Sequence, residues 1–131
     1  MIRVMSIAAL DDGLTVGQVA EQSGVAASAV RFYERQGLIT SRRTSGNQRR
    51  YGPDIPCRIK MIRVAQRIGM SVAEIGAALA LIPEHPGAAD WERLGQYLRA
   101  ELVRRIGELQ QVLAEFSGDG KLCELPAVDR R

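Results

Sequence analysis

The run Asn47 to Tyr51, Asn-Gln-Arg-Arg-Tyr, places two guanidinium groups, two side-chain amides and a phenol in five consecutive residues. It follows Ser45-Gly46, a turn signal, and the apolar pair Leu38-Ile39 lies before that turn. A hairpin of this composition could grip phosphate groups, or it could be a solvated hairpin whose arginines contact only water. The rest of the chain has to distinguish these two interpretations.

Charge is distributed unevenly along the 131 residues. Residues 15–67 contain ten Arg and Lys against three acidic residues, a net charge of +7, and the whole chain carries +3, so the remainder carries −4. This asymmetry favours a polyanionic partner for the front half alone. The sequence has no 18-residue apolar run and no cleavage signature, so we expect a soluble, cytoplasmic protein.

Residues that could catalyse a reaction are sparse. The sequence contains one histidine, His85, and two cysteines, Cys57 and Cys123, which lie 66 positions apart. It shows no Ser-His-Asp arrangement, no informative pair of carboxylates and no glycine-rich phosphate loop. We therefore expect no enzyme, and we expect reduced thiols rather than a disulfide.

Two short helices are predicted to position the front half. Thr15 begins a capping-box pattern for the first helix, and Gly24 provides the turn that ends it. The second helix is expected from about residue 27 to residue 36, with Ser28 and Arg31 near its start. Helix-turn-helix proteins present such N-terminal side chains to the major groove, although any small helical domain can contain two helices and a glycine.

The next segment can form a β-hairpin wing. We expect residues 38–40 as one strand, a turn at residues 44–46 and residues 48–51 as the return strand. Four arginines would then gather on one ribbon: Arg42, Arg43, Arg49 and Arg50.

Two further helices are predicted after the wing. Asp54 is a suitable N-cap for the third helix, which carries an apolar stripe and ends at Gly69. Ser71 and Glu74 form a second capping-box pattern, which begins the fourth helix. Residues 83–87 then interrupt the helical pattern.

The last predicted helix is long and amphipathic, from Asp90 to Phe116. Its apolar positions recur at an average of about 3.6 residues, and it would span about 40 Å, too long for a domain of this size to cover. A second copy could cover it as an antiparallel coiled coil, whereas a helix folded back on its own domain is the alternative. The residues predicted for dimerisation are Trp91, Leu94, Leu98, Leu102, Ile106, Leu109 and Leu113.

Six motifs in order resemble the MerR family of bacterial transcription regulators: Thr15–Ala20, Ser23–Val25, Arg31–Glu34, Gly37–Ile39, Asn47–Tyr51 and Ala65–Gly69. Within the family, Gly46–Tyr51, Gln66–Gly69, Leu81–Pro83 and Trp91 are most similar to the redox-sensing SoxR branch. The resemblance implies a homodimer on an over-long promoter spacer. When its effector arrives, the dimer would bend and untwist the DNA so that RNA polymerase, an indirect partner, engages both promoter elements.

The implied fold class is mostly α, a winged helix-turn-helix DNA-binding domain followed by a long antiparallel coiled-coil dimerisation helix. We accordingly divide the chain into an N-terminal extension at 1–13, the DNA-binding domain at 14–69, a connecting helix and loop at 70–89, the dimerisation helix at 90–116 and a C-terminal effector loop or tail at 117–131.

The resemblance also implies which residues contact double-stranded promoter DNA. The set is Thr15, Ser28, Arg31, Tyr33, Asn47, Arg49, Arg50, Tyr51, Gln66 and Arg67. Ser28 and Arg31 would face bases or the adjacent backbone, and Tyr33 would reach a phosphate. The two residues at 66 and 67 would clamp a further phosphate. For Tyr51, packing at a hinge is the alternative role.

The segment after the long helix departs from the SoxR pattern. SoxR-like proteins carry four closely spaced cysteines there, which bind a [2Fe–2S] cluster, whereas residues 117–131 contain only Cys123. We therefore expect no iron–sulfur cluster and no other cofactor. By resemblance, the effector candidates His85, Trp91, Asp119 and Cys123 would meet across the dimer.

Cys123 is open to three interpretations. It could be a redox thiol helped by Lys121, or one ligand of a sparse and mixed metal site completed by His85 of the partner subunit and Asp119. It could also be an idle residue of a frayed tail, in which case an organic ligand would stack on Trp91 instead. We expect an effector-responsive transcription regulator. The alternatives are a constitutive DNA-binding protein without a sensor and a thiol- or metal-responsive regulator that uses Cys123.

Overall fold

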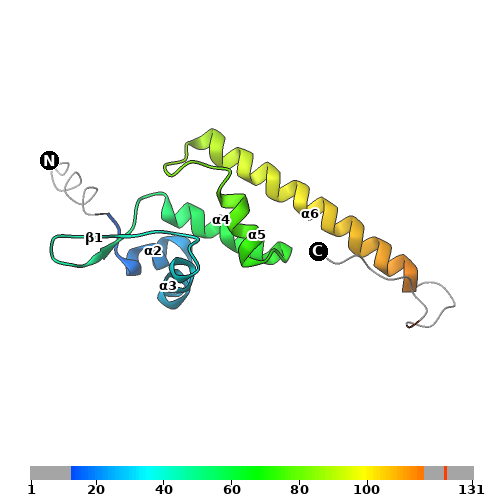
Figure 1. Cartoon of the computed structure of the whole chain (residues 1–131), viewed down its shortest axis with the longest axis horizontal. Helices are drawn as coiled ribbons and strands as arrows, with labels where there is room; N and C mark the ends of the chain where they lie inside the picture. Colours follow the sequence, from blue (N-terminus) through cyan, green and yellow to red (C-terminus); the bar gives the residue numbers. More distant parts are fainter. Residues whose placement is uncertain (1–12, 117–122, 124–131) are drawn as a thin grey trace.

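The computed structural model describes residues 13–116 and residue 123. Its elements in chain order are α2 (Val16–Ser23), α3 (Ala27–Arg35), β1 (Arg42–Arg43), β2 (Arg49–Arg50), α4 (Ile55–Ile68), α5 (Val72–Leu79) and α6 (Ala88–Phe116) (Figure 1). Helices α2 and α3 and the hairpin lie at one end and α4 and α5 lie in the middle, whereas α6 begins above them in this view and runs to the right beyond α5 (Figure 1). This confirms the mostly α class with a small wing and a long final helix.

Helix α2 begins and ends at the two residues that the sequence indicates. The Thr15 hydroxyl accepts a hydrogen bond from the Gln18 amide (3.1 Å), and the Gln18 side chain accepts one from the Thr15 amide (2.9 Å), which completes the capping box. Gly24, at φ 74°, ends the helix, because this left-handed conformation costs glycine no Cβ clash. Helix α3 follows after three residues and packs against α2.

One hydrophobic core joins the inner faces of the helices to the base of the hairpin. Its buried side chains come from every helix and from the segment between α3 and β1. They are Val19, Val30, Tyr33, Leu38, Ile39, Tyr51, Ile55, Ile59, Ile62, Ala65, Met70, Ile75, Ala78, Leu79, Ile82, Leu94 and Leu98. Burial of this set holds α2–α5 and the first half of α6 together.

The wing, residues 42–50, starts later than the sequence prediction placed it. Strands β1 and β2 pair antiparallel, with Arg42 opposite Arg50 and Arg43 opposite Arg49. Leu38 and Ile39 were predicted in the first strand, but they are buried in the core (6% and 2% exposed). The prediction was wrong at this point because burial against α4 and α5 uses both apolar residues before the hairpin begins.

The wing is fixed at its base and at its turn. Leu14 and Tyr51 exchange two backbone hydrogen bonds of 2.8 Å, which attach the chain before α2 to the end of β2. Gly13 makes this approach possible, because its φ is +77° and an added Cβ would lie 2.9 Å from the Tyr51 carbonyl oxygen. At the turn, Asn47 adopts φ 61° and its amide donates to the Thr44 carbonyl (2.8 Å).

Helices α4 and α5 meet at a tight turn. The predicted capping box of α5 is confirmed: the Glu74 amide donates to Ser71 Oγ (3.1 Å) and the Ser71 amide donates to Glu74 Oε1 (2.7 Å). Asp54 is the N-cap residue of α4, as predicted, but its side chain makes no cap hydrogen bond to an amide of the helix. Its carboxylate lies 3.5 Å from Arg58 Nη2 instead, one helical turn further along.

Helix α6 begins two residues earlier than predicted and contains 29 residues, about 43 Å of helix. Leu94 and Leu98 are buried in the core of the same chain (1% and 3% exposed), so they leave the predicted dimer seam. Trp91 is half-buried against that core. The later apolar side chains are 42% to 68% exposed: Leu102, Ile106, Leu109, Leu113 and Phe116.

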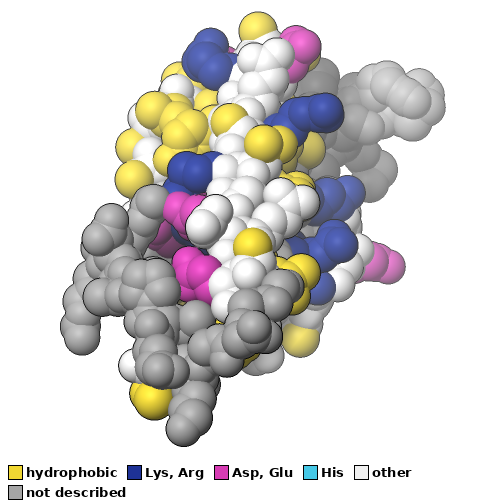
Figure 2. Space-filling model, turned by 90° about the vertical axis from the view of Figure 1, so that its right-hand side faces the viewer, with side chains coloured by type: hydrophobic (Ala, Val, Ile, Leu, Met, Phe, Trp, Pro, Cys, Tyr) yellow, Lys and Arg dark blue, Asp and Glu magenta, His cyan; other side chains and the backbone are white. Residues whose placement is uncertain are grey.

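The space-filling view from the end where α6 finishes shows this uneven surface. Hydrophobic side chains form a patch at the upper left of Figure 2, whereas Lys and Arg side chains gather along its right-hand side. Among the described residues, no helix is both long enough and apolar enough to cross a membrane.

Candidate nucleic-acid interface

The exposed face of α3 carries polar and basic side chains. Val30 and Tyr33 turn inward, and the opposite face presents Ser28, Arg31 and Arg35 to solvent. Positions three and four apart lie on the same side of a helix, so these three side chains form one row. The Arg35 guanidinium lies over the Phe32 ring, 6.0 Å from its centroid, which orients part of this row.

A shallow depression joins α3 to the wing. It encloses about 350 Å³ and is bordered by Arg31 of α3, by Arg43, Arg49 and Arg50 of the wing and by the start of α2. We call this concavity, with the four arginines that border it, the basic depression. Residues that are 12 to 19 positions apart in sequence thus surround one concavity with four guanidinium groups. Such an arrangement binds phosphate groups, because guanidinium donors match phosphate oxygens in geometry and charge.

Glu34 of α3 attaches the wing to this helix. Its carboxylate accepts hydrogen bonds from the Tyr51 hydroxyl (2.7 Å) and from Ser41 Oγ (2.5 Å). Arg49 Nε lies 3.7 Å from the same carboxylate and has no hydrogen-bond partner among the described residues. The carboxylate therefore holds three groups from both sides of the hairpin.

These contacts determine the protonation states of the Glu34 carboxylate and the Tyr51 hydroxyl. Burial alone would raise the pKa of Glu34, but the hydrogen bonds from Ser41 and Tyr51 and the charge of Arg49 hold that pKa below its ordinary value. Burial, and then the hydrogen bond to Glu34, raise the pKa of Tyr51 to about 12. At neutral pH Glu34 is thus a carboxylate bound by the neutral phenol of Tyr51.

Both tyrosines of the predicted DNA-binding set are buried. Tyr33 is 4% exposed, and its hydroxyl donates to Gln66 Oε1 (3.0 Å), so in this structure the hydroxyl orients Gln66. Tyr51 is fully buried, which favours the alternative role in packing. Gln66 and Arg67 themselves are exposed at the end of α4.

Other members of the predicted set help to shape the surface. Arg43 Nη1 donates to the Asn47 carbonyl (3.0 Å) across the wing, and Arg50 Nη2 donates to Gln48 Oε1 (3.0 Å). Thr15 is occupied by the capping box of α2 and borders the basic depression. The sequence reasoning gave no role to Glu34 or Ser41. The available signal was a single acid, Glu34, between the clusters of arginines at 31–35 and 42–50.

Comparisons with known proteins agree with this geometry. Residues 15–51 match the family model described as MerR family regulatory protein, and residues 57–118 match the model described as MerR, DNA binding. The chain is 38% identical over 107 residues to a mercuric resistance operon regulatory protein of Pseudomonas fluorescens, which covers 81% of this chain and 74% of that protein. The chain belongs to the MerR family.

Two further relatives support this assignment. An HTH-type transcriptional activator SoxR homolog of Chromobacterium violaceum is 49% identical over 98 residues, 73% of this chain and 66% of that protein. A crystal structure of a MerR family transcriptional regulator from Listeria monocytogenes has a TM-score of 0.55 at 31% identity, and the match covers 79% of this chain and 80% of that one. These relatives are transcription regulators and not enzymes. The chain spans just under two thirds of the SoxR homologue.

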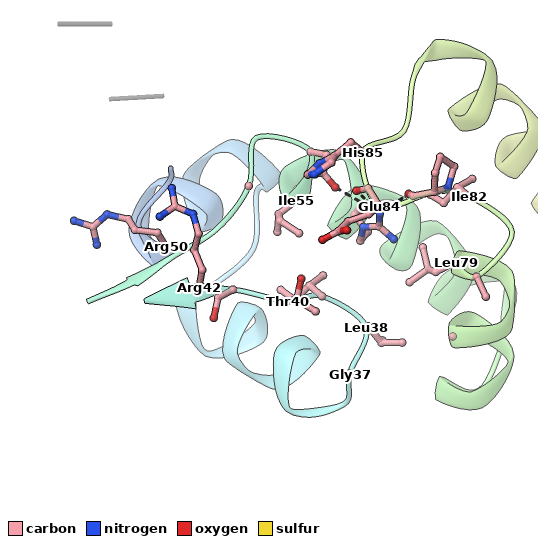
Figure 3. Close-up of a pocket in the computed structure, with 18 residues that line it drawn as sticks. Gly37, Leu38, Thr40, Arg42, Arg50, Ile55, Leu79, Ile82, Glu84 and His85 are labelled. Carbon is pink, nitrogen blue, oxygen red and sulfur yellow. Dashed lines mark hydrogen bonds and ion pairs between the residues drawn. The ribbon is translucent and has the colours of Figure 1, made fainter. Parts of the chain in front are cut away.

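A second concavity of this MerR-family chain lies between the wing base and the loop before α6. It encloses about 550 Å³, and in Figure 3 His85 and Glu84 lie on one side of it, with Leu38 and Thr40 on the other. Arg58 holds the loop to α4. Its Nη2 donates to the carbonyls of Pro83 (3.4 Å) and Glu84 (3.5 Å).

The effector candidates are only partly brought together. His85 is exposed beside the concavity, and the Arg58 guanidinium lies 6.0 Å from the centre of the Trp91 ring. Cys123 is exposed, and Asp119 lies outside the described residues. Within residues 13–116 and 123, no three His, Cys, Asp or Glu side chains group as potential metal ligands.

The cysteines do not fit the cluster of the SoxR branch. A [2Fe–2S] cluster of that type is held by four thiolates. The sequence has only two cysteines, and Cys57, on α4, precedes Cys123 by 66 positions in the sequence. Cys123 alone therefore cannot supply the ligand set, and no function is assigned to a cluster.

Proposed function

We propose that this chain is a homodimeric, effector-responsive transcription regulator that binds pseudo-palindromic promoter DNA and distorts it when its effector is bound. The observation that carries the proposal is the basic depression, in which Arg31 of α3 and three wing arginines surround one concavity. Helix α3 would read bases in the major groove, and the wing would hold the flanking phosphates.

The position of the basic residues supports this mode of binding. Ser28 and Arg31 stand in the exposed row of α3, where base edges are within reach of short and long side chains respectively. Arg67 is exposed at the far end of α4 and would contact backbone outside the wing. A row for bases, flanked by cations on both sides, is the arrangement that fixes the register of a protein on a duplex.

The exposed part of α6 supports the homodimer. Four apolar side chains of its second half, Leu102, Ile106, Leu109 and Leu113, remain 42% to 68% exposed and lie on one face. A contiguous apolar stripe of this kind marks an interaction surface, and a second copy of α6 would cover it symmetrically. The two basic depressions would then face the same side of one DNA duplex.

The names of the relatives support a response to an effector, and DNA distortion is what the resemblance to the MerR family implies. The SoxR homolog is named an activator, and the relative from Pseudomonas fluorescens is named a regulator of mercuric resistance. Bending and untwisting a promoter costs several kcal/mol, so an effector must favour one dimer conformation by a comparable free energy. A DNA-binding protein without a sensor, or a regulator whose signal is oxidation or metal binding at Cys123, are the competing functions.

Selection from a random library of DNA duplexes tests the proposal. We expect the whole chain to enrich a pseudo-palindrome whose two half-sites are related by a dyad, because two identical subunits read them. The variant Arg31→Ala should enrich no sequence or a more degenerate one. Enrichment of a single asymmetric site by the unmodified chain, or no enrichment, would contradict the proposal.

A further inference from the structure

Arg105 of α6 makes contacts with three parts of the chain. Its Nη1 donates to the Gly69 carbonyl at the end of α4 (2.9 Å), and its Nη2 lies 3.2 Å from both carboxylate oxygens of Glu74 on α5. Its Nε donates to Glu101 on α6 (3.0 Å). One guanidinium group thus ties the long helix to the turn between α4 and α5.

The partners of Arg105 are themselves fixed in position. Gly69 ends α4 at φ +96°, and an added Cβ would lie 3.4 Å from Arg105 Nη1, so the turn fits closely around the guanidinium. Glu74 also accepts a hydrogen bond from the Ser71 amide (2.7 Å) in the capping box of α5. The same carboxylate therefore begins α5 and holds α6. Movement of α6 would break contacts with both neighbouring helices at once.

Arg105 lies just beyond the part of α6 that packs against the core. Trp91, which packs against the core and under Arg58, is 14 residues upstream, about 21 Å of helix. Leu94 and Leu98 are buried between these two points, and apolar packing alone would leave the helix free to pivot on them. Arg105 adds a polar contact between α6 and the α4–α5 turn beyond the buried Leu98, at the point where the exposed stripe begins.

We infer that Arg105 is a positioning residue that sets the angle between α6 and the α3–wing unit, and through it the separation of the two half-sites that a dimer contacts. This inference rests on the proposed function, since it requires dimerisation through α6 and two-fold DNA binding. In such a dimer the α6 pair is the rigid connection between two reading units. Any change in the angle at the α4–α5 turn changes the distance and the twist between the two α3 helices.

Arg104 provides a matched control for Arg105. It is the same residue type at the next position and also binds Glu101, and its second ion pair is to Glu108 (2.6 Å). Both partners of Arg104 lie on α6, whereas Arg105 reaches Gly69 and Glu74 on the neighbouring elements. Replacing either arginine removes one positive charge and an ion pair of α6, but only Arg105→Ala removes the contact with α4 and α5.

The test compares half-site spacing preferences. The DNA probe is the duplex selected by the unmodified chain, together with versions in which one or two base pairs are inserted or removed at the dyad. Each inserted base pair moves one half-site by about 3.4 Å and turns it by about 35°. We expect the unmodified chain to lose about tenfold or more in affinity on a single insertion. We expect Arg105→Ala to reduce that discrimination by more than about threefold, and Arg104→Ala to leave it unchanged.

A second variant separates positioning from folding. Glu74→Gln retains an acceptor for the capping box, because glutamine serves at this position, but it removes the charge that faces Arg105. We expect it to reduce the discrimination between spacings by more than about twofold, but by a smaller factor than Arg105→Ala does. Thermal unfolding of each variant is measured in parallel, since loss of stability alone weakens binding to all spacings equally.

The outcomes separate the two hypotheses. A spacing preference that both variants retain within twofold, even with a lowered unfolding temperature, would overturn the inference about Arg105 and leave the proposed function intact. An unmodified chain that dimerises and binds but shows no spacing preference would overturn both. Equal effects of Arg104→Ala and Arg105→Ala would assign the change to the charge of α6 and would also overturn the inference.

Discussion

At the scale of single residues, the basic depression should control the salt dependence of DNA binding. Arg49→Ala and Arg50→Ala each remove one guanidinium group from the wing. If each group neutralises one phosphate, the slope of log affinity against log salt should decrease by about one per variant, because fewer counterions are released on binding. Fluorescence anisotropy with the selected duplex over a salt series measures this slope.

Arg93→Ala is the control for that series. Arg93 is paired with Asp90 on the first turns of α6, away from the wing, so its loss should not alter the slope. If the slopes of Arg49→Ala and Arg50→Ala equal that of the unmodified chain, the wing arginines make no phosphate contact and the DNA interface must lie elsewhere.

The two buried tyrosines allow a direct comparison of hydrogen bonds. Tyr51 donates to the Glu34 carboxylate and Tyr33 donates to the neutral amide of Gln66. Hydrogen bonds to charged groups contribute about 1.5–3 kcal/mol and neutral ones about 0.5–1.5 kcal/mol. We therefore expect Tyr51→Phe to lower the free energy of unfolding more than Tyr33→Phe does, as measured by urea denaturation at neutral pH.

The stability that the Tyr51–Glu34 hydrogen bond contributes should depend on pH in a defined direction. The pKa of Glu34 is lowered in the folded chain, so the stability that its ionised form contributes is present at neutral pH and is lost as the pH falls through that lowered pKa. The pKa of Tyr51 is raised to about 12, so its contribution is full below the ordinary pKa of 10 and is lost as the pH rises towards 12. A difference between Tyr51→Phe and the unmodified chain that stays constant across both ranges would argue against the attachment of the wing through Glu34.

At the scale of elements, α6 divides into a buried half and an exposed half. Leu98 is 3% exposed in the core, whereas Leu109 is 68% exposed. Leu98→Ala should lower the free energy of unfolding by about 2–5 kcal/mol at every protein concentration, because it leaves a cavity in the chain itself. Leu109→Ala should weaken only the dimer, so its unfolding temperature should differ from that of the unmodified chain by an amount that depends on concentration.

Calorimetry over a range of protein concentrations distinguishes these two effects. A concentration-independent loss for Leu109→Ala as large as that for Leu98→Ala would mean that the second half of α6 packs within its own chain. The division of α6 into core and interface would then be incorrect.

Local signals allowed several elements to be predicted from the sequence. Thr15 and Ser71 begin their helices through capping boxes that involve residues only three positions apart, so no tertiary information was needed. The start of the wing was predicted too early because the burial of Leu38 and Ile39 depends on helices that come later in the chain. Asp54 stands at the predicted N-cap position, but its carboxylate pairs with Arg58 and not with an amide of the helix, which the residue type alone does not reveal.

Local sequence signals also allowed part of the candidate site to be predicted. The arginines of the wing and Arg31 were recognised from their types and from the motifs around them. A helical period of 3.6, however, is the same for an apolar side chain that packs on its own domain and for one that packs on a partner, so Leu94 and Leu98 were placed in the wrong group. Likewise, the sequence contains Tyr33 and Gln66 but does not show that the hydroxyl of the first donates a hydrogen bond to the side chain of the second.

At the scale of the whole molecule, the exposed stripe of α6 should make the chain a dimer in solution. Ile106→Asp would place a carboxylate in the centre of that stripe, where burial without a partner costs several kcal/mol. We expect sedimentation velocity to show a dimer for the unmodified chain at micromolar concentration and a monomer for this variant. Gln96→Asp, at an exposed position outside the stripe, is the control and should remain dimeric.

The proposed function requires that two copies of the basic depression bind one duplex. Hydroxyl-radical footprinting of the whole chain on its selected duplex measures this directly, because the cleavage pattern reports which sugars the protein covers. The proposed function predicts two protected regions related by a dyad and separated by about one helical turn or a multiple of it, with the flanking protection lost in Arg49→Ala. A single protected region without two-fold symmetry, at saturating protein, would contradict it.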